Sequence, residues 1–286
     1  MYVSVFSLVS QEIPAIITLS YRIFQEVLST QFGKDENLNL TIMSLTGKVA
    51  LVTGGSKGIG RSISLHLASL GAKVVVNYSS DASSAESTVK EIGPSAFAIK
   101  ADVGNVSEIT SLVEKSVKHF GKLDILIACA GIMPLNELEN VSESEFDRIF
   151  NLNVKGPLFL SQKAAAHMTT GGRIILFSTT LCAASTVTPN YLAYVLSKGA
   201  IEQMARVMSK DLARKGIMVN AVAPGPTATD LFMKGKPDSV LKMIAGFNPQ
   251  NRIGKPDEIA EVVGFLSGEG ARWITGQTVR INGGMA

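Results

Sequence analysis

Short apolar runs recur along the chain between residues 48 and 281, and each is followed by a longer segment with a polar face. The first run, at 48–53, is too short for a helix and almost wholly apolar, which is typical of a strand buried on both faces. The same pattern predicts further strands at 74–76, 96–99, 123–128, 173–177, 217–222 and 278–281.

The segments between these strands have the spacing of amphipathic helices. Ile63, Leu67 and Leu70 share one helical face, and Gly71 ends that pattern. Further helices are predicted at 82–92, 107–120, 143–168, 191–214 and 257–266. This alternation predicts an α/β fold. We expect one Rossmann-type domain, a doubly wound parallel sheet of seven strands with helices on both faces and right-handed crossovers.

The first 42 residues differ from the rest of the chain. They contain two basic and four acidic residues, and Pro14 interrupts their apolar positions. Secretory and transit signals instead carry an excess of basic residues. We expect 1–42 to be a poorly ordered extension or a gene-model artefact, and 43–286 to be the folded domain.

The composition narrows the class of protein. With 46% hydrophobic residues, 18% charged residues and a net charge of +3, the chain is too apolar to be disordered. We find no apolar run long enough for a membrane span and no basic block that predicts nucleic-acid binding. Cys129 and Cys182 allow no disulfide framework, and no cluster has zinc-ligand spacing. We therefore expect a cytoplasmic protein without a metal.

A glycine-rich turn joins the first strand to the first helix. Residues 53–60 are Thr-Gly-Gly-Ser-Lys-Gly-Ile-Gly. Glycines let the backbone approach a pyrophosphate closely, and the free amides of the helix then face the anion. A tight turn without a ligand is the alternative, but the position after the first strand favours a dinucleotide. The predicted contacts are Gly54, Ser56, Lys57, Gly58, Ile59 and Gly60.

The end of the second strand indicates which nicotinamide cofactor binds. An acid there would grip the ribose 2′-hydroxyl of NAD, whereas this chain has Asn77, Ser79 and Ser80 and no acid before Asp81. Lys57 adds a cation on the same side. These residues predict NADPH, provided that Asp81 caps the following helix.

Tyr194 and Lys198 are four residues apart on a predicted helix, so both project from one face. A free tyrosine has a pKa of about 10, which a nearby ammonium lowers toward the range useful for proton exchange. Taken alone, a surface Tyr–Lys pair on an amphipathic helix would be the better interpretation, because such pairs often arise by chance.

The joint pattern resembles the short-chain dehydrogenase/reductase family over residues 45–286. The glycine turn, Tyr194 and Lys198, Asn153 in an Asn-Leu-Asn-Val segment, Pro224-Gly225 and Asn282-Gly283-Gly284 occur in that order. Within the family the chain is most similar to NADPH-dependent carbonyl reductases. The subgroups are 3-oxoacyl-carrier-protein reductases, polyhydroxynaphthalene reductases and aldehyde reductases.

The resemblance implies roles for individual residues. Tyr194 is the general acid for a carbonyl oxygen, and Lys198 holds the nicotinamide ribose and lowers the tyrosine pKa. Asn153 anchors a proton-relay water, unless it is only an asparagine packed in a helix bend. The remaining implied cofactor contacts are Asp102 and Val103 at the adenine, Ala130 and Gly131 after the fourth strand, and Pro224, Gly225, Thr227 and Thr229 near the carboxamide.

Two positions depart from the family pattern. The catalytic serine is replaced: counting six residues from Arg173 reaches Thr179, whereas counting back from Tyr194 points to Thr180 or later, and Ser178 is a third alternative. We choose Thr179, because a threonine hydroxyl can still donate to the developing alkoxide. Cys129 stands where the family has asparagine, and we interpret it as a small buried hydrophobe.

Residues 226–251 resemble a substrate lid with apolar side chains. We expect reduction of an apolar or aromatic ketone or aldehyde. The alternatives are an alcohol dehydrogenase working in the oxidative direction and a catalytically silent dinucleotide-binding protein. The family resemblance also implies a homodimer or homotetramer formed through helices 143–168 and 191–214.

Overall fold

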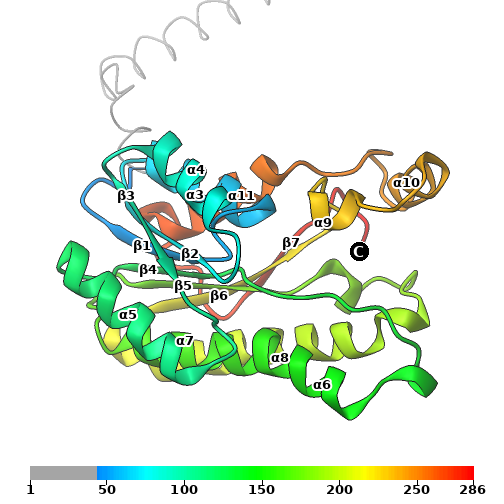
Figure 1. Cartoon of the computed structure of the whole chain (residues 1–286), viewed down its shortest axis with the longest axis horizontal. Helices are drawn as coiled ribbons and strands as arrows, with labels where there is room; N and C mark the ends of the chain where they lie inside the picture. Colours follow the sequence, from blue (N-terminus) through cyan, green and yellow to red (C-terminus); the bar gives the residue numbers. More distant parts are fainter. Residues whose placement is uncertain (1–43) are drawn as a thin grey trace, which may run out of the picture. The chain divides into compact units, whose positions relative to one another are not determined.

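The computed structural model describes residues 44–286, so the prediction for 1–42 lies outside the described residues. Seven parallel strands form one sheet in the order β3-β2-β1-β4-β5-β6-β7 (Figure 1). The strands are β1 (Val49–Thr53), β2 (Lys73–Tyr78), β3 (Ala96–Lys100), β4 (Ile125–Ala128), β5 (Arg173–Phe177), β6 (Met218–Pro224) and β7 (Thr278–Ile281). The predicted doubly wound parallel sheet is confirmed.

Helices cover both faces of the sheet. On one side lie α3 (Gly58–Ser69), α4 (Ala82–Ile92) and α11 (Pro256–Ser267); on the other lie α5 (Val106–Phe120), α6 (Glu143–Phe150), α7 (Gly156–Ala165) and α8 (Leu192–Leu212) (Figure 1). All five residues of β1 are buried. Val49 and Leu51 belong to one core cluster and Ala50 and Val52 to the other, so β1 contributes to two cores. None of the helices in 44–286 is long and apolar enough to cross a membrane.

The helix predicted at 143–168 is interrupted in its middle. Between α6 and α7 the chain makes a π-helical turn, Asn151–Lys155, and α7 ends at Ala165. A π-helical turn widens the backbone by one residue, and such turns are frequent at functional sites. Here it carries Asn153, whose side chain is fully buried.

The winding of the sheet reverses between β1 and β4, which are neighbours although β2 and β3 lie between them in sequence. Ligands of open α/β sheets bind beyond the carboxyl ends of the strands at such a switch point. The loops after these two strands meet there, since a Cβ atom on Gly54 would lie 3.2 Å from the Cα atom of Ala130.

The turn after β1 brings the backbone of Gly60 against the backbone of Gly54, so position 60 has no room for a side chain. A Cβ atom on Gly60 would lie 2.1 Å from the Gly54 carbonyl oxygen, and a backbone oxygen cannot move aside cheaply. We predict that Gly60→Ala lowers the free energy of unfolding by about 1–3 kcal/mol, measured by urea denaturation. Gly199→Ala is the matched control, because nothing lies within 4 Å of its added Cβ atom. Equal stability of the two variants would contradict the prediction.

Candidate active site

The glycine turn forms a cradle at the start of α3. Gly54 and Gly58 adopt left-handed conformations, with φ values of 62° and 51°. The Ser64 hydroxyl donates to the carbonyls of Gly55 and Gly60 and closes the turn from inside. No side chain caps the N-terminus of α3, and its first turn contains no acid. The geometry therefore fits a pyrophosphate, which the exposed amides would bind.

Asp81 caps α4, as expected from the sequence. Its carboxylate accepts hydrogen bonds from the backbone N–H and the hydroxyl of Ser84, each at 2.9 Å. Lys57 forms an ion pair with the same carboxylate. The Lys57 ammonium, together with the Ser84 backbone N–H, lowers the pKa of Asp81 to about 2. The Lys57 ammonium of the glycine turn is thus held at the N-terminus of α4 by the Asp81 carboxylate.

Asn77 does not face this cradle. Its amide nitrogen is buried and donates to the carbonyl oxygens of Tyr78, Ile99 and Ala101, so its N–H groups hold the end of β2 to β3. The Asn77 side chain therefore has no N–H free for the cofactor contact expected from the sequence. Ser79 and Ser80 are exposed at the strand end.

The two residues of the predicted adenine contact have different environments. Asp102 is exposed, and its Oδ1 atom accepts the Gly104 N–H at 2.8 Å, leaving its other oxygen outside this turn. Val103 is buried, and its carbonyl oxygen packs against Gly156 at the start of α7.

Thr179, Tyr194 and Lys198 come together beyond the end of β5. The Thr179 side chain lies close enough to the Tyr194 phenol to act on its pKa. Lys198 is buried, donates from Nζ to the Phe177 carbonyl oxygen at 2.7 Å, and lies 5.8 Å from the centre of the Tyr194 ring. A hydroxyl, a phenol and an ammonium thus line the same cavity.

The two alternative hydroxyls are engaged elsewhere. Ser178 Oγ donates to Glu202 Oε1 on α8 at 2.8 Å, and Thr180 Oγ1 accepts from the Asn282 amide at 2.7 Å. Thr179 lies between the end of β5 at Phe177 and a short 3-10 helix that begins at Thr180. Glu202 and Asn282 have supporting contacts that sequence reasoning missed, because their partners are distant in sequence.

The pKa values in the structure differ from the expected effect of Lys198. Burial raises the pKa of Tyr194 to about 12, although the hydrogen bond from Thr179 opposes it. Burial also lowers the pKa of Lys198 to about 8. The Lys198 ammonium is directed at the Phe177 carbonyl and not at the phenol, so desolvation dominates both groups.

Asn153 connects the loop after β4 to α8. Its Oδ1 atom accepts the Ile132 N–H at 3.0 Å, and its Nδ2 atom donates to the Ile132 carbonyl at 2.9 Å and to Ser197 Oγ at 3.1 Å. A Cβ atom on Gly131 would lie 3.2 Å from Asn153 Oδ1 and 3.4 Å from Lys198 Nζ. Asn153 therefore lies next to Gly131 and Lys198, and its amide group holds the backbone of Ile132 in place.

Cys129 lies in the wall of the same site. Burial raises the pKa of its thiol to about 12, so the sulfur is a neutral thiol at physiological pH. This agrees with its interpretation as a small hydrophobe. Within the described residues, no group of three or more His, Cys, Asp or Glu side chains could hold a metal ion.

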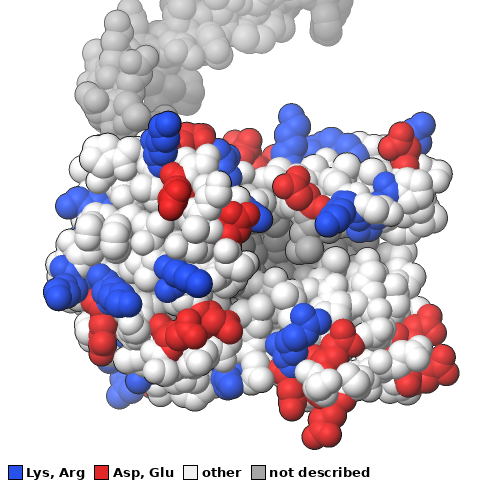
Figure 2. Space-filling model, in the orientation of Figure 1, with Lys and Arg blue, Asp and Glu red and all other residues white. Residues whose placement is uncertain are grey.

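A cavity of about 550 Å³ opens beside Tyr194 and is lined largely by apolar side chains. Figure 2 shows the hollow between the upper and lower parts of the molecule, with walls that are mostly uncharged. The predicted cofactor residues Ile59, Gly131, Pro224, Gly225, Thr227 and Thr229 contribute to it.

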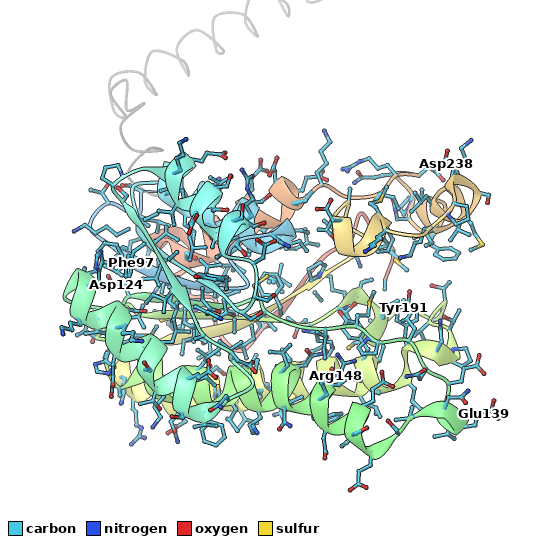
Figure 3. The ribbon with its side chains drawn as sticks, in the orientation of Figure 1. Phe97, Asp124, Glu139, Arg148, Tyr191 and Asp238 are labelled. Carbon is cyan, nitrogen blue, oxygen red and sulfur yellow. The ribbon has the colours of Figure 1, made fainter. Side chains whose placement is uncertain are left out.

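The segment predicted as a lid contributes side chains to the wall of this cavity. It contains two short helices, α9 (Asp230–Met233) and α10 (Asp238–Ala245). Thr227 Oγ1 donates to the Gly225 carbonyl and Thr229 Oγ1 accepts the Phe232 N–H, so both predicted contacts shape the base of the lid. Tyr191 lies across the cavity from the lid (Figure 3). Tyr191, Leu135 and Met285 are lining residues that the sequence analysis missed.

Comparison with known proteins agrees with the fold. A family model described as enoyl-(acyl carrier protein) reductase matches residues 54–286. A short chain dehydrogenase of Emericella nidulans is 44% identical over 85% of this chain and 96% of its own. A probable tetrahydroxynaphthalene reductase of Zymoseptoria tritici is 42% identical over 84% and 94%.

Solved structures with similar sequences have the same fold. A dehydrogenase/reductase from Sinorhizobium meliloti 1021 has a TM-score of 0.83 and 34% identity, covering 87% of this chain and 99% of that chain. An angucycline C-6 ketoreductase with bound NADP has a TM-score of 0.80 and 38% identity, covering 85% and 96%. The chain therefore belongs to the short-chain dehydrogenase/reductase family.

Burial of Lys198 makes stability depend on pH. The folded pKa of about 8 lies below the ordinary value of about 10.4, so between these values the unfolded chain binds more protons and stability rises with pH. We predict that wild type gains on the order of 1 kcal/mol or more relative to Lys198→Met between pH 7.5 and 10, measured by urea unfolding. A wild-type-minus-variant difference that does not change with pH would contradict this.

Proposed function

We propose that this protein reduces a ketone or aldehyde to an alcohol with NADPH, and that its substrate is an apolar or aromatic carbonyl compound. The observation that carries the proposal is the convergence of Thr179, Tyr194 and Lys198 on an apolar cavity beside the glycine cradle. Family membership supports oxidoreductase chemistry.

The chain's own groups have the protonation states that a reduction requires. NADPH, when bound, supplies the hydride for the carbonyl carbon. The Tyr194 phenol, with its pKa raised to about 12, stays protonated at neutral pH and donates its proton to the carbonyl oxygen. The Thr179 hydroxyl donates a hydrogen bond to the same oxygen as charge develops. One carbonyl, one hydride and one proton give one alcohol, and bulk water restores the tyrosine proton.

Lys198 and Asn153 support this transfer. Lys198, with a pKa of about 8, is mostly charged at pH 7, and its ammonium is held at the Phe177 carbonyl oxygen, 5.8 Å from the centre of the Tyr194 ring. Gly131, next to Lys198 and Asn153, leaves room for the nicotinamide ribose, which Lys198 would hold. Gly54, Ser56, Gly58, Ile59 and Gly60 would hold the pyrophosphate, and Asp102 and Val103 the adenine.

Three side chains support NADPH over NADH. Lys57, Ser79 and Ser80 border the end of β2, where a 2′-phosphate would lie, and the related angucycline ketoreductase has NADP bound. The apolar cavity supports an aromatic substrate, as does the name of the related tetrahydroxynaphthalene reductase.

We also propose that the protein forms a homodimer or homotetramer in the cytoplasm. Phe146, Leu158, Leu196 and Val207 are large apolar residues exposed on α6, α7 and α8. These are the helices through which assembly is expected, and burial of their apolar side chains would stabilise it.

The assignment of the hydroxyl and the phenol is tested by two substitutions. We predict that Tyr194→Phe lowers kcat for reduction of 2-tetralone by about 10²-fold or more, and that Thr179→Val lowers it by about 10²–10³-fold. NADPH binding, measured by fluorescence, should persist in both. Thr180→Val and Ser178→Ala are the comparison variants and should retain kcat within about tenfold. A larger loss in either comparison variant than in Thr179→Val would contradict the assignment.

The cofactor preference is tested at the Lys57–Asp81 pair. We predict that Lys57→Ala weakens NADPH binding at least tenfold, about 1.4 kcal/mol, while NADH binding is unchanged. Asp81→Asn keeps a capping side chain for α4 but releases Lys57, so NADPH should bind more tightly. Lys90→Ala on α4 is the control. Equal losses for both cofactors in Lys57→Ala would refute a role in phosphate recognition.

A further inference from the structure

The charged side chains that line the cavity are all basic. Of its lining residues, all within the described part of the chain, Lys198 and Lys236 have charged side chains and none is Asp or Glu. Lys198 belongs to the catalytic group on α8. Lys236 comes from the lid, between α9 and α10, and has no part in the chemistry described above.

The lid holds the Lys236 side chain at the cavity. Its backbone N–H donates to the Met233 carbonyl at 3.2 Å, and Gly235, with a φ of 74°, and Pro237 shape the turn around it. Its Nζ atom donates to the Phe232 carbonyl oxygen and lies 4.5 Å from the centre of the Phe232 ring, which also lines the cavity. The half-buried ammonium is therefore fixed over an aromatic wall.

Among residues 44–286, this ammonium has no acidic partner. None of the ion pairs among residues 44–286 includes Lys236. Asp238, two residues away, lies on the side of α10 turned away from Tyr191 and the cavity (Figure 3). An ammonium has three N–H donors, and the Phe232 carbonyl uses one of them. Two donors thus remain for a ligand.

A cation beside an apolar surface attracts an anion more strongly than one in open water. The carbonyl of a substrate is directed to Tyr194 and Thr179 on the β5–α8 side, whereas Lys236 belongs to the lid. A substrate that satisfies both contacts has a carbonyl on one part of an apolar skeleton and an acidic group on another. The Phe232 ring next to Lys236 suits an aromatic skeleton.

We propose that Lys236 binds an acidic group of the substrate, so that the enzyme prefers aromatic ketones that carry a carboxylate or an ionised phenol. The inference rests on the proposed function for the position of the carbonyl. The binding contact itself does not require turnover.

The test uses two probes with the same ketone skeleton, one anionic and one neutral: 6-oxo-5,6,7,8-tetrahydronaphthalene-2-carboxylate and its methyl ester. Their dissociation constants are measured by calorimetry at pH 7 in the presence of NADP⁺, which has no hydride to give. We expect wild type to bind the acid at least tenfold more tightly than the ester. Lys236→Met should lose at least tenfold in affinity for the acid and leave the ester unchanged, whereas Lys236→Arg should retain the preference.

Lys234→Met is the matched control, because Lys234 is an exposed lid lysine outside the cavity lining. Equal affinity for acid and ester, or loss of the preference in Lys234→Met as well, would overturn the inference. The same probes are then tested with NADPH. Charge-dependent binding without NADPH oxidation would count against the proposed reduction and leave the Lys236 contact standing. Oxidation of NADPH by both probes with equal kcat/KM in wild type and Lys236→Met would count against Lys236 alone.

Discussion

The buried amide of Asn153 is the interaction on which the geometry of the site depends. It binds both backbone groups of Ile132 and the hydroxyl of Ser197, and Ser197 Oγ in turn donates to the Tyr194 carbonyl at 2.6 Å. A buried amide left without partners costs about 1–3 kcal/mol, so these segments are held together. The π-helical turn places Asn153 on the inner side of its helix. Asn153 therefore fixes the loop after β4 and the start of α8 relative to one another.

Desolvation determines the protonation states of the ionisable side chains near Asn153. Burial favours the neutral forms of Tyr194, Lys198 and Cys129 alike. For the phenol this keeps a proton in place at neutral pH, as a reduction requires. For the thiol it removes a nucleophile from the wall of the cavity. The charge of Lys198 has a single hydrogen-bond partner among the described residues, the Phe177 carbonyl oxygen, and this contact offsets only part of the desolvation.

Patterns in the sequence predicted the sheet and the glycine turn because both depend on local periodicity and on backbone freedom. The alternation of buried runs requires a parallel sheet, and the helix cap at Asp81 follows from its place before α4. The choice among Ser178, Thr179 and Thr180 could not be made this way. It depends on Glu202 and Asn282, which reach the strand end only after the chain has folded.

Two expectations differ from the structure for the same physical reason. Asn77 was expected to contact the cofactor, and Lys198 was expected to lower the pKa of Tyr194. Both residues are buried, and their polar groups bind nearby carbonyls instead. Lys236 and Met285 reach the cavity through the lid and through the left-handed turn at Gly283 and Gly284, and such contacts have no periodic signal.

Transfer of a hydride to a bound carbonyl is the central claim, and isotope transfer measures it most directly. The protein is incubated with NADPH deuterated at both C4 positions and with 2-tetralone, and the alcohol is analysed by mass spectrometry. The account predicts one deuterium at the carbinol carbon of each alcohol molecule. Alcohol without deuterium, or bound NADPH that never yields alcohol from any aromatic ketone, would contradict it.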